Sequence, residues 1–75
     1  MKTYTNGSPA DRGQADSYCR RPRNPHWYPF GTATDVRYEE WDMNERQIKE
    51  YHTAFDQNEE DGWFKYLADH DWVYL

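Results

Sequence analysis

Most of the large apolar side chains in this sequence are aromatic. Leu, Ile, Val and Phe together number only eight in 75 residues, which is fewer than an ordinary globular chain carries. Fourteen residues are Trp, Tyr or Phe, and each of these rings can bury about 150–250 Å². In so short a chain, the free energy gained by burial and the conformational entropy lost on folding nearly cancel. We therefore expect one small, marginally stable domain with an aromatic core, because a disordered chain lacks such rings.

The first predicted helix covers residues 9–19. Ser8 can cap its N-terminus, and Pro9 suits the first helical position because the N–H that proline lacks would be unpaired there anyway. Two prolines soon after the helix end it, since the residue before a proline is pushed out of the helical region. Residues 22–34 then form an irregular, proline-rich aromatic loop, and a short strand is predicted around Tyr38.

An amphipathic helix is predicted near residues 43–57, with Asp42 as its N-cap. Its apolar positions recur at helical spacing: Ile48, Tyr51, Ala54 and Phe55. Charged and polar residues occupy the opposite side of this helix. The pattern therefore predicts one face packed against the rest of the domain.

A further helix is predicted near residues 59–69, because Asn58 and the carboxylates after it suit a helix N-terminus. Gly62 in its first turn leaves a single bent helix as the alternative. The strand-like residues 72–75 are candidates to pair with residues 2–5. The predicted fold is mainly α: a small domain of two to three short helices with a proline-rich aromatic loop, or α+β if the termini pair.

Charge divides the chain into a basic arm and an acidic body. Residues 1–37 hold six basic and three acidic side chains, and residues 38–75 hold three basic and eleven acidic ones, which gives the net charge of -5. We expect a single domain over residues 1–75. Within it, residues 1–34 form a basic N-terminal arm and helix, and residues 35–75 form an acidic helical body.

The sequence predicts no cofactor, no metal site and no catalysis. His26, His52 and His70 do not fall at a metal-ligand spacing, and a chain this short is a poor frame for a catalytic base with an oxyanion hole. Cys19 is the single cysteine, so it cannot form an internal disulfide, and a reducing cytoplasm is expected. The sequence has no apolar run long enough for a membrane span, and we expect no signal peptide.

Two binding surfaces are predicted. The first is an acidic helical face that would steer a protein with a basic surface, with aromatic residues as anchors: Glu45, Glu50, Glu59, Glu60 and Asp61. Such a surface can also imitate the phosphates of a nucleic acid. The alternative is a basic, aromatic loop that would bind RNA, the ribosome or a single strand directly: Arg20, Arg21, Arg23, His26, Trp27 and Tyr28. The net charge of -5 opposes this alternative.

The segment from Gly7 to His26 resembles small uncharacterised proteins of tailed bacteriophages. It carries their signature DRGxADxYxxRPxxPH, and residues 51–55 with Asn58, Glu59 and Gly62 resemble their second block. A fainter similarity to ribosome modulation factor rests on Arg12-Gly13, Ala15 and the later Gly62-Trp63, although that protein is basic and this chain is acidic. The phage resemblance implies a protein that acts in the cytoplasm of an infected bacterial cell. Such proteins often bind and inhibit host machinery, which favours a non-catalytic effector.

Overall fold

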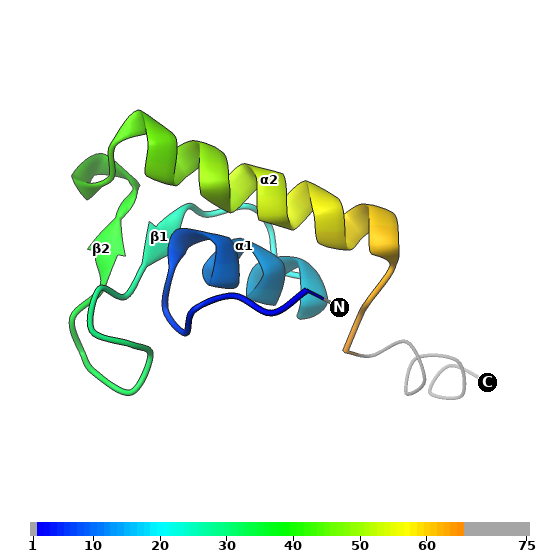
Figure 1. The fold of residues 1–75 in the computed structure, drawn as a ribbon, viewed down its shortest axis with the longest axis horizontal. Helices are drawn as coiled ribbons and strands as arrows, with labels where there is room; N and C mark the ends of the chain where they lie inside the picture. Colours follow the sequence, from blue (N-terminus) through cyan, green and yellow to red (C-terminus); the bar gives the residue numbers. More distant parts are fainter. Residues whose placement is uncertain (1, 66–75) are drawn as a thin grey trace.

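The computed structural model describes residues 2–65 (Figure 1). The elements follow in chain order: helix α1 (Pro9–Tyr18), strand β1 (His26–Trp27), strand β2 (Tyr38–Glu39), 3-10 helix η1 (Glu40–Asp42) and helix α2 (Glu45–Asp61). Helix α1 packs against α2, and the two short strands lie towards the N-terminal end of α2 (Figure 1). The domain is therefore mainly helical with a small antiparallel pairing, which confirms the predicted fold class.

Helix α1 begins where its local chemistry predicts. The Ser8 hydroxyl accepts a hydrogen bond from the Asp11 backbone N–H at 3.1 Å, and the Asp11 carboxylate accepts one from the Gly7 N–H at 2.9 Å. Pro9 occupies the first helical position, where its missing N–H costs nothing. After the helix, Arg20 adopts a left-handed backbone conformation with a φ of 60°. The predicted helix over residues 9–19 is confirmed to within one residue.

Helix α2 begins later than predicted because Asn44, and not Asp42, caps its N-terminus. The Asn44 side chain accepts from the Gln47 N–H at 2.8 Å, and the Gln47 side chain accepts from the Asn44 N–H at 2.9 Å. This reciprocal capping box satisfies two backbone donors at once. Asp42 instead ends the preceding η1 helix and accepts from the Glu39 N–H at 3.3 Å.

The prediction that a separate helix starts at residue 59 is wrong, because α2 continues to Asp61. Asn58 does not act as a cap, since its amide points into the core and donates to the Ser17 hydroxyl at 2.9 Å and to the Trp63 carbonyl at 2.8 Å. The helix ends at Gly62, whose φ of 76° suits a residue without a Cβ. Residues 66–69 of the predicted helix lie outside the described residues.

Strand pairing forms away from the chain termini. Residues 2–5 form no strand, and residues 72–75 lie outside the part of the chain that the structure describes. Strands β1 and β2 pair instead, with His26 opposite Glu39 and Trp27 opposite Tyr38. The loop predicted to be irregular thus contributes one of the two strands.

The interior between the helices is small and mixed in polarity. Its buried apolar side chains are Met43, Tyr51, Ala54 and Phe55, and its buried polar ones are Gln14, Asp16, Ser17, His26 and Asn58. Helix α1 lies directly against the α2 backbone at Gly13, where an added Cβ would lie 2.1 Å from the Tyr51 carbonyl oxygen. No helix within residues 2–65 is long and apolar enough to span a membrane.

Candidate functional site

A buried hydrogen-bond network joins α1, the loop after it and α2. The Tyr51 hydroxyl donates to the Asp16 carboxylate and accepts from the Asn24 N–H at 2.9 Å. Asp16 also accepts from Nε of Arg21 at 2.9 Å. Burial and the hydrogen bond to Asp16 raise the pKa of Tyr51 far above its usual value, so the hydroxyl stays protonated. The network therefore holds the loop against both helices.

The buried His26 ring lies beside this network, next to the Asp16 carboxylate. Burial lowers the pKa of His26 and outweighs the hydrogen bond with the Asn24 carbonyl, which favours the charged ring. The ring is therefore neutral at pH 7, and its Nδ1 lies 2.7 Å from that carbonyl and 3.8 Å from the Asp16 carboxylate. A neutral ring that donates Nδ1–H to Asn24 fixes the chain as it enters β1.

Beside this network lies a pocket of about 370 Å³ whose wall is rich in arginine. Arg12 reaches it from α1, Arg21 from the loop after α1, and Arg37 from the residue before β2. The other lining residues are Asp16, Pro22, Asn24, His26 and Tyr28. Three guanidinium groups and one carboxylate leave this wall with a net charge of +2 when His26 is neutral. We call it the basic pocket.

Each arginine of the basic pocket is held at its Nε by a carboxylate. Arg12 donates to Asp11 at 3.1 Å and Arg21 to Asp16 at 2.9 Å. Nε of Arg37 lies 2.7 Å from a Glu39 oxygen. The remaining guanidinium nitrogens keep N–H groups available for other acceptors, since an arginine carries five donors.

The structure brings half of the predicted basic, aromatic loop to this pocket, namely Arg21, His26 and Tyr28. Arg12 and Arg37 were not predicted as site residues, because they lie outside the loop in sequence and reach the pocket only through the tertiary fold. The signals for Arg12 in the sequence were its place in the phage-type signature and in the fainter similarity to ribosome modulation factor.

The other half of that loop contacts different parts of the molecule. The Arg20 guanidinium lies 4.5 Å from the centroid of the Phe64 ring. Arg23 lies 4.3 Å from the centroid of the Phe55 ring and hydrogen-bonds to the Asp56 carboxylate. The Trp27 ring packs edge-on against Tyr38, with ring centroids 5.8 Å apart.

The predicted acidic residues are all exposed, but they are spread along α2 and do not form one face. Glu45 lies in the first turn of α2, whereas Glu60 and Asp61 lie at its C-terminal end. Glu59 accepts a hydrogen bond from the Ser17 hydroxyl at 2.5 Å, so it contributes to the contact between the helices.

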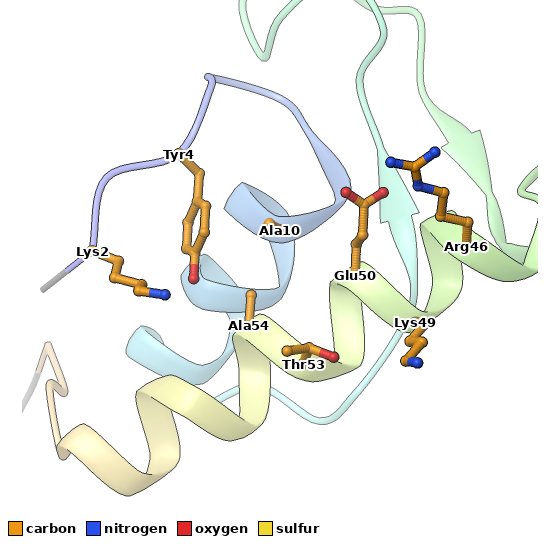
Figure 2. A pocket seen from close by; sticks show the side chains of 8 residues that line it. All are labelled: Lys2, Tyr4, Ala10, Arg46, Lys49, Glu50, Thr53 and Ala54. Atoms are coloured by element: carbon orange, nitrogen blue, oxygen red, sulfur yellow. The ribbon is translucent and has the colours of Figure 1, made fainter.

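The fifth of these acidic residues, Glu50, lines a second pocket of about 320 Å³ between the N-terminal segment and α2 (Figure 2). Three cations share this pocket with it: Lys2, Arg46 and Lys49. Tyr4, Ala10, Thr53 and Ala54 complete the lining. Glu50 therefore lies in a basic environment and not within an acidic surface.

Exposed apolar side chains gather between residues 30 and 41, on the segments around β2 and η1. They are Phe30, Val36, Tyr38 and Trp41. Carboxylates lie within this stretch and just after it: Asp35, Glu39, Glu40, Asp42 and Glu45. We call these nine residues the acidic aromatic end. Its β2 and η1 part lies near the N-terminal end of α2, and the loop between β1 and β2 extends away from that helix (Figure 1). Trp63, which is also exposed, follows the C-terminal end of α2.

The chain matches no protein-family model, no curated protein and no solved structure. Within residues 2–65, no group of three or more His, Cys, Asp or Glu side chains is placed to hold a metal ion. Cys19 is a free, half-buried thiol at the end of α1.

Proposed function

We propose that this protein is a small, non-catalytic effector that binds and modulates a host or phage protein through the acidic aromatic end. The observation that carries this proposal is Trp41, whose side chain is 83% exposed. A chain with so few apolar residues gains stability from every ring that it buries, so an exposed tryptophan is unused by the fold. Tryptophan is also among the residues that most often dominate the free energy of a protein interface.

The charge around Trp41 supports a partner with a basic surface. Glu40 and Asp42 flank the ring in sequence, and the remaining carboxylates of the acidic aromatic end lie in the same stretch. Such charges speed the encounter with a basic partner and disfavour acidic ones. This places the proposed surface mainly on β2 and η1, whereas the sequence favoured the exposed face of α2. If the partner handles DNA or RNA, the surface acts as a nucleic-acid mimic.

The proposed setting is the cytoplasm of an infected bacterial cell. Its support is the resemblance of residues 7–26 to small proteins of tailed bacteriophages. The same segment builds the contact between α1, the following loop and α2.

Capture from bacterial lysate, with and without nuclease, tests the proposal. The tagged full-length protein should retain one protein in stoichiometric amount, and nuclease should not release it. Trp41→Ser should lower the amount captured by about ten-fold or more, which corresponds to the roughly 1.4 kcal/mol or more that an interface hot spot contributes. Trp63→Ser is the matched control, because Trp63 is 50% exposed and follows the opposite end of α2.

Equal capture by the two variants would contradict the proposal. Ribosomal proteins that appear without nuclease and vanish with it would instead assign binding to the basic, aromatic loop, and would make direct RNA binding the function.

A further inference from the structure

We propose that the basic pocket binds the phosphate group of a small phosphate ester. No lining residue of this pocket belongs to the acidic aromatic end, although Glu39 of that end pairs with Arg37, and the inference does not depend on the proposed function. It starts from three guanidinium groups, those of Arg12, Arg21 and Arg37, that line one pocket of a chain whose net charge is -5. Each of these arginines pairs with a carboxylate, so the attraction for an anion rests on the guanidinium N–H groups that have no acceptor within residues 2–65 and not on an excess of positive charge.

The donors that remain free in the pocket suit a tetrahedral dianion. Nη1 of Arg12 and both Nη groups of Arg21 donate to no acceptor among the described residues. Nη1 of Arg37 makes only a long contact of 3.5 Å, to the Tyr28 hydroxyl. A phosphate group has several acceptor oxygens, and guanidinium pairs bind these with two parallel hydrogen bonds.

The carboxylates behind the arginines prepare the pocket for a ligand. Asp11, Asp16 and Glu39 each hold one arginine at its Nε, which fixes the guanidinium before any ligand arrives. Less side-chain entropy is then lost on binding. Asp16 lines the pocket, but its charge is already shared by the Tyr51 hydroxyl and Arg21, which weakens its repulsion of an anion.

The size of the pocket selects a small ligand over a polymer. Its volume of about 370 Å³ lies at the lower end of the roughly 300–1,000 Å³ typical of small-molecule sites. A nucleic-acid strand needs a groove that follows several successive phosphates. The ring of Tyr28, with the Arg12 guanidinium 5.8 Å from its centroid, offers an aromatic contact for the organic part of the ester.

Arginine Nε–Hε signals in NMR spectra of the full-length protein test this inference. We use inorganic phosphate, adenosine 5′-monophosphate and adenosine as probes. The first two should shift the signals of Arg12, Arg21 and Arg37 saturably, and adenosine should not. If phosphate alone binds as tightly as the monophosphate, the ligand is free phosphate and the ester is excluded. Tighter binding of the monophosphate supports the ester.

Substitutions locate the binding. Arg12→Gln should weaken adenosine monophosphate binding by about ten-fold, as expected for one lost charge-assisted hydrogen bond. Arg37→Gln should do the same at a more exposed position, where folding is less affected. Arg46→Gln, in the second pocket, is the matched control and should leave binding unchanged. Thermal unfolding of each variant confirms that it folds.

Besides equally tight binding of phosphate and the monophosphate, three results would overturn the inference. They are no saturable shift with either phosphate probe, equal shifts with adenosine, and equal weakening by Arg46→Gln and Arg12→Gln. A short RNA without a terminal phosphate is a further probe. If it binds more tightly than adenosine monophosphate, and Arg12→Gln abolishes that binding, the ligand of the pocket is a nucleic acid and not a small phosphate ester. Trp41→Ser should leave phosphate binding unchanged, so failure of one proposal is distinguishable from failure of the other.

Discussion

Tyr51 shows how a single side chain holds several segments of this domain together. It is fully buried, and its ring lies on the apolar stripe that the sequence predicted for α2. Its hydroxyl reaches across the interior to Asp16 of α1 and to the backbone of Asn24. Helical spacing predicts that the ring is buried, but it contains no information about a partner 35 residues away in the chain.

Tyr51→Phe should lower the free energy of unfolding by about 1–3 kcal/mol. The substitution keeps the ring, but it removes one hydrogen-bond donor from the buried Asp16 carboxylate and leaves the Asn24 N–H without its acceptor. Chemical denaturation measures the loss. Tyr38→Phe is the matched control, because Tyr38 is exposed, and its effect should stay within about 0.5 kcal/mol. Equal stabilities of the two variants would show that the network adds nothing to folding.

At the scale of the elements, the contact between α1 and α2 depends on one glycine. Gly13 lies inside α1, where glycine normally costs about 1 kcal/mol relative to alanine. The structure explains its presence, since a Cβ at this position would overlap the Tyr51 carbonyl oxygen. The close approach of the helices therefore requires glycine at a position where helix propensity alone would favour alanine.

Gly13→Ala should destabilise the domain by about 1–3 kcal/mol, even though alanine favours the isolated helix. The added methyl group forces α1 away from α2 and weakens the contact between the two helices. Thermal unfolding measures the change. Gly62→Ala is the comparison, because an added Cβ there meets nothing and only the positive φ is unfavourable, at a cost of about 1 kcal/mol. A Gly13→Ala variant as stable as the wild type would contradict this account of the helix contact.

How well each element was predicted depends on how local its determinants are. Helix α1 was predicted from Ser8 and Pro9, and both act within one turn of the helix. The second N-terminus predicted at Asn58 was wrong, because a tertiary hydrogen bond to Ser17 uses the side chain that resembled a cap. Similarly, the cap of α2 was predicted at Asp42, but Asn44 and Gln47, which lie at the same spacing two residues later, form the capping box.

The candidate sites were less predictable than the fold, because they combine residues that are distant in sequence. The basic pocket takes Arg12 and Arg37 from either side of the loop in which the sequence placed the basic surface. Charge counting located the acidic half of the chain, but it could not separate Glu59, which bonds to Ser17, from the carboxylates that stay free for a partner.

At the scale of the whole molecule, charge and aromatic exposure are arranged unevenly. Exposed rings and carboxylates share the region of β2 and η1, and the basic pocket is built from α1, the loop after it and residues of and beside the two strands. A molecule with this distribution can orient a charged partner before contact, because the field of the acidic aromatic end acts over roughly a Debye length, about 8 Å at physiological salt.

This arrangement predicts different kinetic effects for charge and for tryptophan. Once a partner is captured, Asp35→Asn with Glu40→Gln should slow its association several-fold at low salt and change its dissociation little. Trp41→Ser should mainly speed dissociation. Surface-based kinetic measurements at two salt concentrations separate the two effects. Glu60→Gln, near the C-terminus of α2, is the control for charge alone. An equal effect of that control on association would argue against steering by the acidic aromatic end.

The polar contact between the helices also fixes the register of α1 on α2. Hydrogen bonds are directional, so α1 cannot slide along α2 by one turn without breaking the bonds of Ser17 to Asn58 and Glu59 and the bond of Tyr51 to Asp16. An aliphatic interface could repack after such a slide, but this one has a single register. If a partner binds as proposed, we expect it to meet two helices in a fixed register, with the adjustment on binding taken up by the loops around β2 and η1.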